Sequence, residues 1–163
     1  RGYLYPVLAR SLGVVGGGEC PPAVAHLAQA TGAAIARAGA VLICGGLGGV
    51  MSAAARGARQ AGGLTVGILP GEAHRDANPF IDVAIVTDMG HARNALVVRS
   101  SHALIALAGE YGTLSEIALA LKIGIPVIGL DHWTHLAGGG TAGTADDAVA
   151  LALASAERVY TRP

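Results

Sequence analysis

The stretch that most restricts the fold is residues 108–116, Ala-Gly-Glu-Tyr-Gly-Thr-Leu-Ser-Glu, which joins a short apolar run to a segment with helical spacing. It has the features of a strand-to-helix corner built on glycine. The first N–H groups of such a helix lack hydrogen-bond partners and the helix dipole favours negative charge, so a phosphate is the expected ligand. A second glycine corner lies at residues 44–51, Cys-Gly-Gly-Leu-Gly-Gly-Val-Met. Together the corners predict binding of a nucleotide or another phosphate-bearing ligand.

Short apolar runs alternate with helical segments along the chain. Runs rich in Val, Ile and Leu have the pattern of strands buried on both faces, and they are Leu12–Gly16, Ala40–Cys44, Leu64–Leu69, Val83–Val86, Ala103–Leu107 and Pro126–Leu130. Apolar residues at helical spacing predict helices over residues 24–35, 51–58, 92–97 and 114–121, and from Asp146 to about Ala156. This alternation predicts an α/β fold, a single Rossmann-like doubly wound parallel sheet flanked by helices, with ligands at the carboxyl ends of the strands.

Composition limits the domain count and the partners. With 163 residues, 52% of them hydrophobic and 13% charged, the chain suits one nucleotide-binding-like domain over residues 1–163, with residues 1–10 extended or irregular. The net charge is zero and the basic residues are scattered, which argues against nucleic acid or an anionic membrane as a partner. No apolar stretch reaches the ~20 residues of a membrane helix and no signal-peptide core is visible, so a cytoplasmic protein is expected.

The reactive side chains suggest little further chemistry. Cys20 and Cys44 are the only cysteines, and both are expected to be reduced. His132 and His135 have no third ligand nearby, so no metal site is expected. Lys122, the single lysine, lies two turns past the first-described corner without a setting for pyridoxal phosphate, so a decarboxylase that uses that cofactor is not expected.

Two segments without periodicity, Pro70–Asp82 and His132–Thr144, are predicted as loops. Either could close over a ligand or serve as a plain surface connection. Gly39 and Gly124 fall just after predicted helices, where a residue with positive φ ends a helix easily. His91 could line a cleft or simply be a polar residue at the start of a helix.

Several motifs resemble one known family. The corner AGEYGTLSE resembles the PGGxGTxxE signature of the lonely-guy-type proteins, formerly labelled lysine decarboxylases, many of which are cytokinin-activating phosphoribohydrolases. CGGLGGVMSAAARGA is similar to the family's GGGxxGLM segment, and the span Leu12–Leu130 can be laid on the family pattern. Within the superfamily, ANPFIDVAIVTDMGHARN and GTLSEIALALK look closest to the branch of molybdenum cofactor carrier proteins.

The resemblance implies roles for particular residues. Arg93 stands where the family keeps its catalytic arginine, and Glu116 matches the signature glutamate. It also implies a homodimer in which helices of two subunits complete each cleft. The glycine turn after the first strand is either a ligand contact or a simple tight turn. With that turn and both corners, the implied ligand and phosphate contacts are Gly16, Gly17, Gly45, Gly46, Gly48, Gly49, Met51, Gly109, Tyr111, Gly112 and Thr113.

Four positions depart from the family pattern. Ala108 replaces a proline, Glu110 replaces a glycine, Cys44 replaces a glycine, and Asn94 stands where the hydrolases usually carry lysine. A carboxylate at Glu110 aimed into a phosphate cradle would cost about 1 kcal/mol at ~4 Å in water and more when buried. Either this side chain points away from the cradle, or the ligand has a different geometry.

Glu116 and Arg93 each have an ordinary structural alternative. Thr113 followed by Glu116 matches a capping box, in which both side chains satisfy N–H groups at a helix start. Arg93 could be a surface residue of the third predicted helix. At a functional site, Glu116 would instead stabilise an oxocarbenium-like ribose or activate water, while Arg93 would hold a phosphate or position the base.

Two hypotheses about function remain. In the first, which the altered corners favour, the protein binds or carries a phosphate-bearing, nucleotide-like molecule such as the molybdenum cofactor or a nucleoside monophosphate. In the second, it is an enzyme that hydrolyses a nucleoside 5′-monophosphate to free base and ribose 5-phosphate. Both use one cleft and the same residues.

Overall fold

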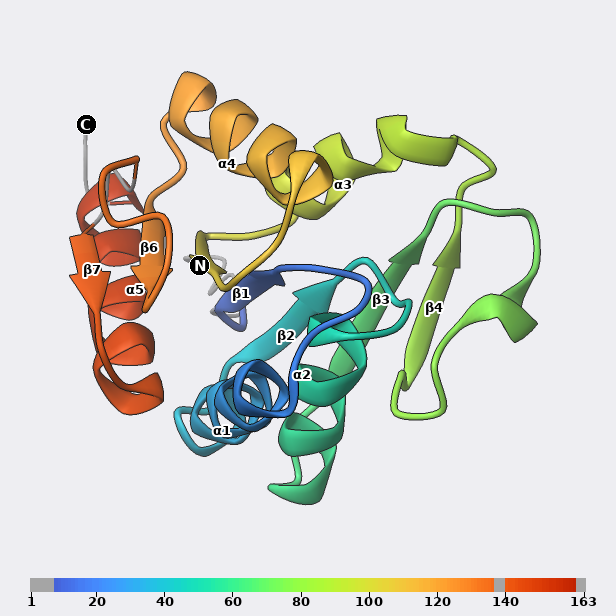
Figure 1. The fold of residues 1–163 in the computed structure, drawn as a ribbon, viewed down its shortest axis with the longest axis horizontal. Coiled ribbons are helices and arrows are strands. Elements are labelled where there is room, and N and C mark those ends of the chain that lie inside the picture. Colours follow the sequence, from blue (N-terminus) through green and yellow to red (C-terminus); the bar gives the residue numbers. More distant parts are fainter. Residues whose placement is uncertain (1–7, 137–139, 161–163) are drawn as a thin grey trace, which may run out of the picture.

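Seven strands form the centre of the computed structural model, which describes residues 8–136 and 140–160 (Figure 1). They are β1 Ser11–Val15, β2 Val41–Cys44, β3 Thr65–Leu69, β4 Val83–Val86, β5 Ala103–Ala106, β6 Val127–Leu130 and β7 Gly140–Ala142. All neighbours are parallel, in the order β4-β3-β2-β1-β5-β6-β7. The predicted doubly wound parallel sheet is confirmed.

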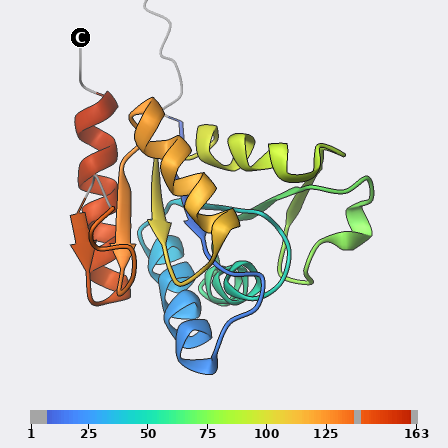
Figure 2. The same ribbon diagram turned by 45° about the horizontal axis from the view of Figure 1, so that its top comes forward.

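Helices cover both faces of this sheet (Figure 1, Figure 2). α1 (Pro22–Arg37), α2 (Val50–Gln60) and α5 (Ala145–Tyr160) share one apolar cluster, and α3 (Asn94–Arg99) and α4 (Tyr111–Ile123) share the other. Two 3-10 turns, η1 (His74–Asp76) and η2 (Gly90–Arg93), precede β4 and α3. Among the described residues, no helix combines the length and apolar character that crossing a membrane requires.

Position in the sheet determines how deeply each apolar strand is buried. Every residue of β5 is buried, because helices cover this central strand on both faces. The expected burial on both faces was wrong for β4, which lies at an edge with Val83 and Ile85 each 44% exposed. The six strands expected from the sequence are all present, with ends that differ by at most one residue.

The prediction of a loop over His132–Thr144 was partly wrong. β7 lies inside it and pairs with β6, with Ile128 opposite Gly140 and Leu130 opposite Ala142. This three-residue strand lacks the apolar run that would have predicted it from the sequence. It forms by pairing with the edge of β6. The two glycines before Gly140 lie outside the described residues.

The helix ends follow local rules more closely. Gly39 and Gly124 have φ of 74° and 83°, which confirms that they end α1 and α4 in left-handed conformations. The helix predicted over residues 92–97 begins instead as a 3-10 turn before it becomes α3. α5 is longer than predicted and reaches Tyr160.

α1 and α2 cross at close range because a glycine of each helix faces the other's backbone. A Cβ at Gly32 would overlap the Ala54 carbonyl group, lying 2.7 Å from its carbon. A Cβ at Gly57 would lie 2.7 Å from the carbonyl carbon of Gln29. Since backbone cannot move aside cheaply, the spacing of these helices depends on both glycines.

Gly32→Ala should therefore lower the free energy of unfolding by about 2 kcal/mol through overpacking at this crossing. Urea denaturation monitored by circular dichroism measures the change. Gly143→Ala is the control, since no atom of the described residues lies within 4 Å of its added Cβ. Equal stabilities of the two variants would contradict the close-packing argument.

Candidate functional site

The order of the strands places a crevice between β1 and β5. From β1 the chain moves outward through β2 and β3 to β4, then crosses back to β5 on the other side of β1. In doubly wound sheets, ligands bind where the winding direction changes, at the carboxyl ends of the strands. The turn after β1 and the turn after β5 meet there, since the Gly17 N–H donates to the Ala108 carbonyl oxygen at 2.8 Å.

The corner between β2 and α2 closes against the same turn. The Val50 N–H donates to the Gly17 carbonyl oxygen at 3.0 Å, and Gly49 has a φ of 62° that favours glycine. A Cβ at Gly16 would lie 2.7 Å from the Val50 side chain. The first N–H group of α2 therefore already has a hydrogen-bond partner within the protein.

The corner between β5 and α4 is open in comparison. The first helical hydrogen bond of α4 runs from the Leu114 N–H to the Glu110 carbonyl oxygen at 2.9 Å. The preceding N–H groups, those of Tyr111, Gly112 and Thr113, have no partner within an α-helix by geometry. Within the described part of the chain, no side chain caps this end of α4. Among the described residues, this corner therefore leaves three N–H groups free for an anion, and the start of α2 leaves two.

A cleft of about 560 Å³ occupies the crevice. Most of the residues predicted for ligand contact or catalysis line it, namely Gly16, Gly17, Gly45, Met51, Arg93, Gly109, Gly112, Thr113 and Glu116. Further lining comes from Val14, Val15, Gly18, Glu19, Cys20, Pro21, His91, Asn94, Ala108 and Glu110. The site predicted from two separate motifs is thus one continuous cavity.

Four predicted contacts do not line this cleft. Gly46 is buried against Leu69 behind it, while Gly48 and Gly49 pack beside the backbone of Gly18. Tyr111 is 87% exposed at the start of α4.

Arg93 is buried, which rules out the surface arginine considered from the sequence. Its Nη1 donates to Asn94 Oδ1 and its Nη2 donates to the Gly45 carbonyl oxygen at 3.4 Å. Its Nε is buried without a hydrogen-bond partner among the described residues. Burial lowers the pKa of Arg93, and the nearby Glu116 and Cys44 oppose that shift. The guanidinium is therefore a cation with unused hydrogen-bonding capacity at the cleft wall.

Glu116 is also buried in the cleft wall, at 7% exposed. No ion pair within 4 Å or hydrogen bond joins its carboxylate to another described residue. Burial raises its pKa to about 7, and the charge of Arg93 opposes the rise. Near neutral pH this carboxyl group can therefore accept or donate a proton.

The capping box, which was the structural alternative for Thr113 and Glu116, is absent from the described residues. α4 begins at Tyr111 with Glu110 at its N-cap, so Thr113 lies within the helix and cannot cap it. Neither Thr113 nor Glu116 makes the side-chain bonds that such a box requires. The glycine corner sets the first residue of α4. Glu116 therefore lines the cleft and does not cap the helix.

Two departures from the family pattern have simple structural explanations. Glu110 lines the cleft but is exposed, so water reduces the repulsion between its carboxylate and a bound phosphate. Cys44 is fully buried at the end of β2 and does not line the cleft. Its burial raises the pKa of the thiol to about 11, so the thiol remains neutral.

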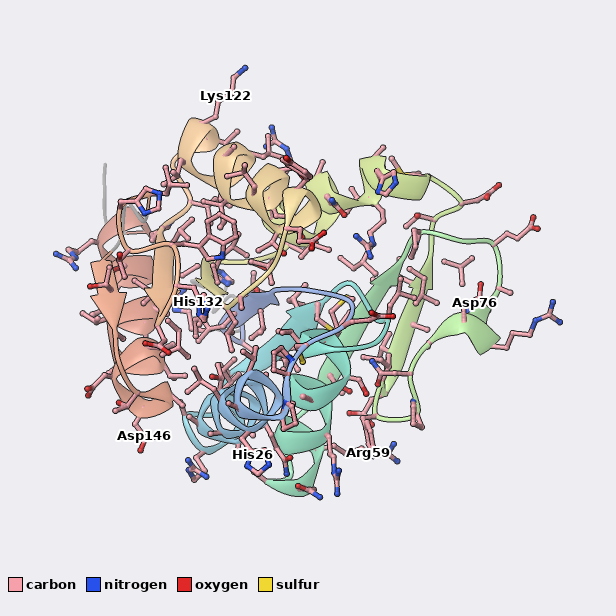
Figure 3. All side chains as sticks on the ribbon, viewed as in Figure 1. His26, Arg59, Asp76, Lys122, His132 and Asp146 are labelled. Carbon is pink, nitrogen blue, oxygen red and sulfur yellow. The ribbon has the colours of Figure 1, made fainter. Side chains whose placement is uncertain are left out.

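The other candidate residues lie away from this site. Lys122 points outward from α4 (Figure 3) and does not line the cleft. His132 and His135 do not line the cleft, and within the described ranges no cluster of three metal-ligating side chains occurs. His91 does line it, from the 3-10 turn that leads to Arg93. Cys20 and Cys44 are both free thiols.

Sequence reasoning missed the wall formed by residues 19–21, Glu-Cys-Pro, which leads from the glycine turn into α1. Its sequence carries no motif. The only available signal was its place directly after a glycine triplet that follows a central strand.

Comparison with known proteins agrees with this fold. A protein of Archaeoglobus fulgidus is 48% identical over 144 residues, covering 88% of this chain and 95% of that protein. The cytokinin riboside 5′-monophosphate phosphoribohydrolase of Mycobacterium tuberculosis is 39% identical over 123 residues, or 69% of this chain and 65% of the enzyme. The solved structure of the molybdenum cofactor binding protein of Rippkaea orientalis has a TM-score of 0.85 at 38% identity, covering 91% and 98% of the two chains.

These relatives confirm the resemblance to lonely-guy-type proteins near the carrier branch. The sequence profile of the SLOG cluster4 family matches residues 9–160, nearly the whole described chain. The chain belongs to the SLOG cluster4 family.

Proposed function

We propose that this protein binds a phosphate-bearing, nucleotide-like small molecule in the cleft between β1 and β5. One observation carries the proposal: the open N-terminus of α4 and the buried Arg93, with its unpartnered Nε, line one cavity. Free backbone N–H groups and a cation with unused donors together favour an anion. The cavity volume of about 560 Å³ is in the usual range for small-molecule and cofactor sites.

Molybdenum cofactor is the ligand we favour, and it would be carried rather than chemically changed. The similar protein of Rippkaea orientalis is described as binding that cofactor. The residues fit its phosphate: Gly109, Gly112 and Thr113 would hold it at the start of α4, with Arg93 supplying charge. Gly16, Gly17 and Gly45 would let the ligand approach the backbone closely. The phosphate of a nucleoside monophosphate would fit the same donors.

Hydrolysis of a nucleoside 5′-monophosphate is the second candidate. Glu116, whose pKa is raised to about 7 by burial, shares the cleft with Arg93. A carboxyl group poised near neutral pH suits proton transfer during cleavage of an N-glycosidic bond. The similar enzyme of Mycobacterium tuberculosis carries that activity in its name. We rank this candidate second because Asn94 and Glu110 depart from the hydrolase pattern.

A homodimer accompanies this proposal. It rests on the family resemblance and on the apolar side chains of Val83, Ile85 and Met89, which are 44%, 44% and 47% exposed in and just after the edge strand β4. Size-exclusion chromatography with light scattering measures the mass directly. A monomer at micromolar concentration would contradict the assignment.

Calorimetric titration with AMP, ribose 5-phosphate and adenosine tests the proposed binding. AMP and ribose 5-phosphate should bind, while adenosine should bind at least about 10-fold more weakly, because it lacks the charged group that the donors recognise. Equal affinities for AMP and adenosine would contradict a phosphate site.

Chromatography of the same AMP samples separates the two candidate functions. Binding without release of adenine over hours is expected for a carrier. Release that disappears in Glu116→Gln would establish the hydrolase instead, with Glu116 as a catalytic group.

A further inference from the structure

Asn94 stands between the two parts of the proposed anion site. It is the first residue of α3, is 8% exposed, and lines the cleft beside Arg93. No motif predicts a function for it, and in the sequence it is visible only as a departure from the lysine that hydrolases usually carry. Each polar atom of its side chain nevertheless makes a hydrogen bond.

The two ends of the Asn94 amide contact different elements. Its Oδ1 accepts from Nη1 of Arg93, and its Nδ2 donates to Oγ of Ser115 at 3.3 Å. Ser115 in turn donates to the Gly112 carbonyl oxygen at 2.7 Å. A continuous chain of hydrogen bonds therefore runs from the guanidinium to the first turn of α4.

Arg93 has a further contact at its other terminal nitrogen. Nη2 donates to the Gly45 carbonyl oxygen, so both terminal nitrogens are held while Nε is left without a partner. A guanidinium fixed at two points loses less conformational entropy when it binds an anion. Asn94 supplies one of these two contacts to the guanidinium. Through Ser115 it also links the guanidinium to the start of α4, where the backbone N–H groups are free.

We propose that Asn94 is a positioning residue, whose amide fixes the Arg93 guanidinium relative to the glycine corner at the start of α4. An amide suits this position because it both accepts and donates. A lysine there could not accept from Arg93 and would set a second cation against it. The residue at this position thus distinguishes this chain from the hydrolases. Here a neutral amide, that of Asn94, accepts a hydrogen bond from Arg93.

Rotation of the Arg93 guanidinium tests this proposal without any ligand. In wild-type protein labelled with ¹³C and ¹⁵N, exchange of the two Arg93 Nη signals by rotation of the guanidinium about the Nε–Cζ bond should be slow. Asn94→Leu, which keeps the bulk and removes both polar atoms, should speed the exchange by about 10-fold, corresponding to the loss of one hydrogen bond to a charged group. Asn94→Asp keeps an acceptor oxygen and should keep the slow exchange.

Unchanged exchange in Asn94→Leu, or fast exchange in Asn94→Asp, would overturn the proposal. Ser115→Ala guards against a folding defect, because Ser115 is exposed and its loss removes only the link to α4. In that variant the rotation should remain slower than in Asn94→Leu, while AMP affinity should fall by about 3-fold. An unchanged AMP affinity in Ser115→Ala would contradict the link.

The effect on ligand rests on the proposed function and is measured separately. Asn94→Leu should weaken AMP binding by about 10-fold in the wild-type background and by less than about 2-fold when Arg93 is already methionine. Equal losses in both backgrounds would show that Asn94 does not act through Arg93. If wild-type protein does not bind AMP, the proposed function fails, while the rotation measurement still decides the role of Asn94.

Discussion

Arg93→Met should lower the affinity of the cleft for AMP by about 100-fold, or about 3 kcal/mol, because it removes the one buried cation that lines the cleft among the described residues. The free energy of unfolding should fall by less than this, by about 1 kcal/mol. Methionine leaves the Asn94 Oδ1 and the Gly45 carbonyl oxygen without their donor, but it also removes the cost of burying the unpartnered Nε. Calorimetric titration and urea denaturation measure the two effects.

Arg99→Met is the matched control for this substitution. Arg99 is exposed at the end of α3 and does not line the cleft. It should bind AMP as the wild type does. If both arginine variants lost affinity equally, the effect would come from overall charge and not from the cleft.

Glu116→Gln should raise the free energy of unfolding at pH 8 by about 3 kcal/mol and leave it almost unchanged at pH 4. Burial raises the pKa of Glu116 from 4.5 to about 7. The folded state therefore holds the proton more tightly than the unfolded state. Wild-type stability should fall as pH rises from about 4.5 to about 7 and then level off, with about 1.4 kcal/mol lost per pKa unit. Glutamine does not ionise, so the variant should lack this fall.

Denaturation curves collected between pH 4 and pH 8 measure the difference. Glu72→Gln is the control, because Glu72 is exposed and lies outside the cleft. Its stability should follow the wild type at every pH. A Glu116→Gln variant that is less stable than wild type at pH 8 would mean that the carboxylate makes a stabilising contact.

Local patterns predicted most of the fold. β1 to β6 were recognised because each is a run of apolar residues, and Gly39 and Gly124 marked the ends of their helices correctly. β7 was missed because its three residues are held by the edge of β6 rather than by their own hydrophobicity. The two glycine corners were also predicted, because the glycines that such turns need are visible in the sequence.

The interior of the site could be predicted only in part. Thr113 and Glu116 matched a capping box, but the start of α4 depends on how the corner meets the turn after β1, through contacts such as that between Gly17 and Ala108. The burial of Arg93 depends likewise on Gly45 and Asn94. Such contacts join residues far apart in the chain, so they cannot be predicted from the spacing of residues within a motif.

The most direct test of the anion site is a ¹H–¹⁵N spectrum of the uniformly labelled protein titrated with AMP. Saturable shifts should appear in the backbone amides of Gly109, Gly112 and Thr113, and they should be absent when adenosine replaces AMP. The amide of Gly57, at the crossing of α1 and α2, should not move. Shifts confined to other surfaces, or the same shifts with adenosine, would contradict phosphate binding at the start of α4.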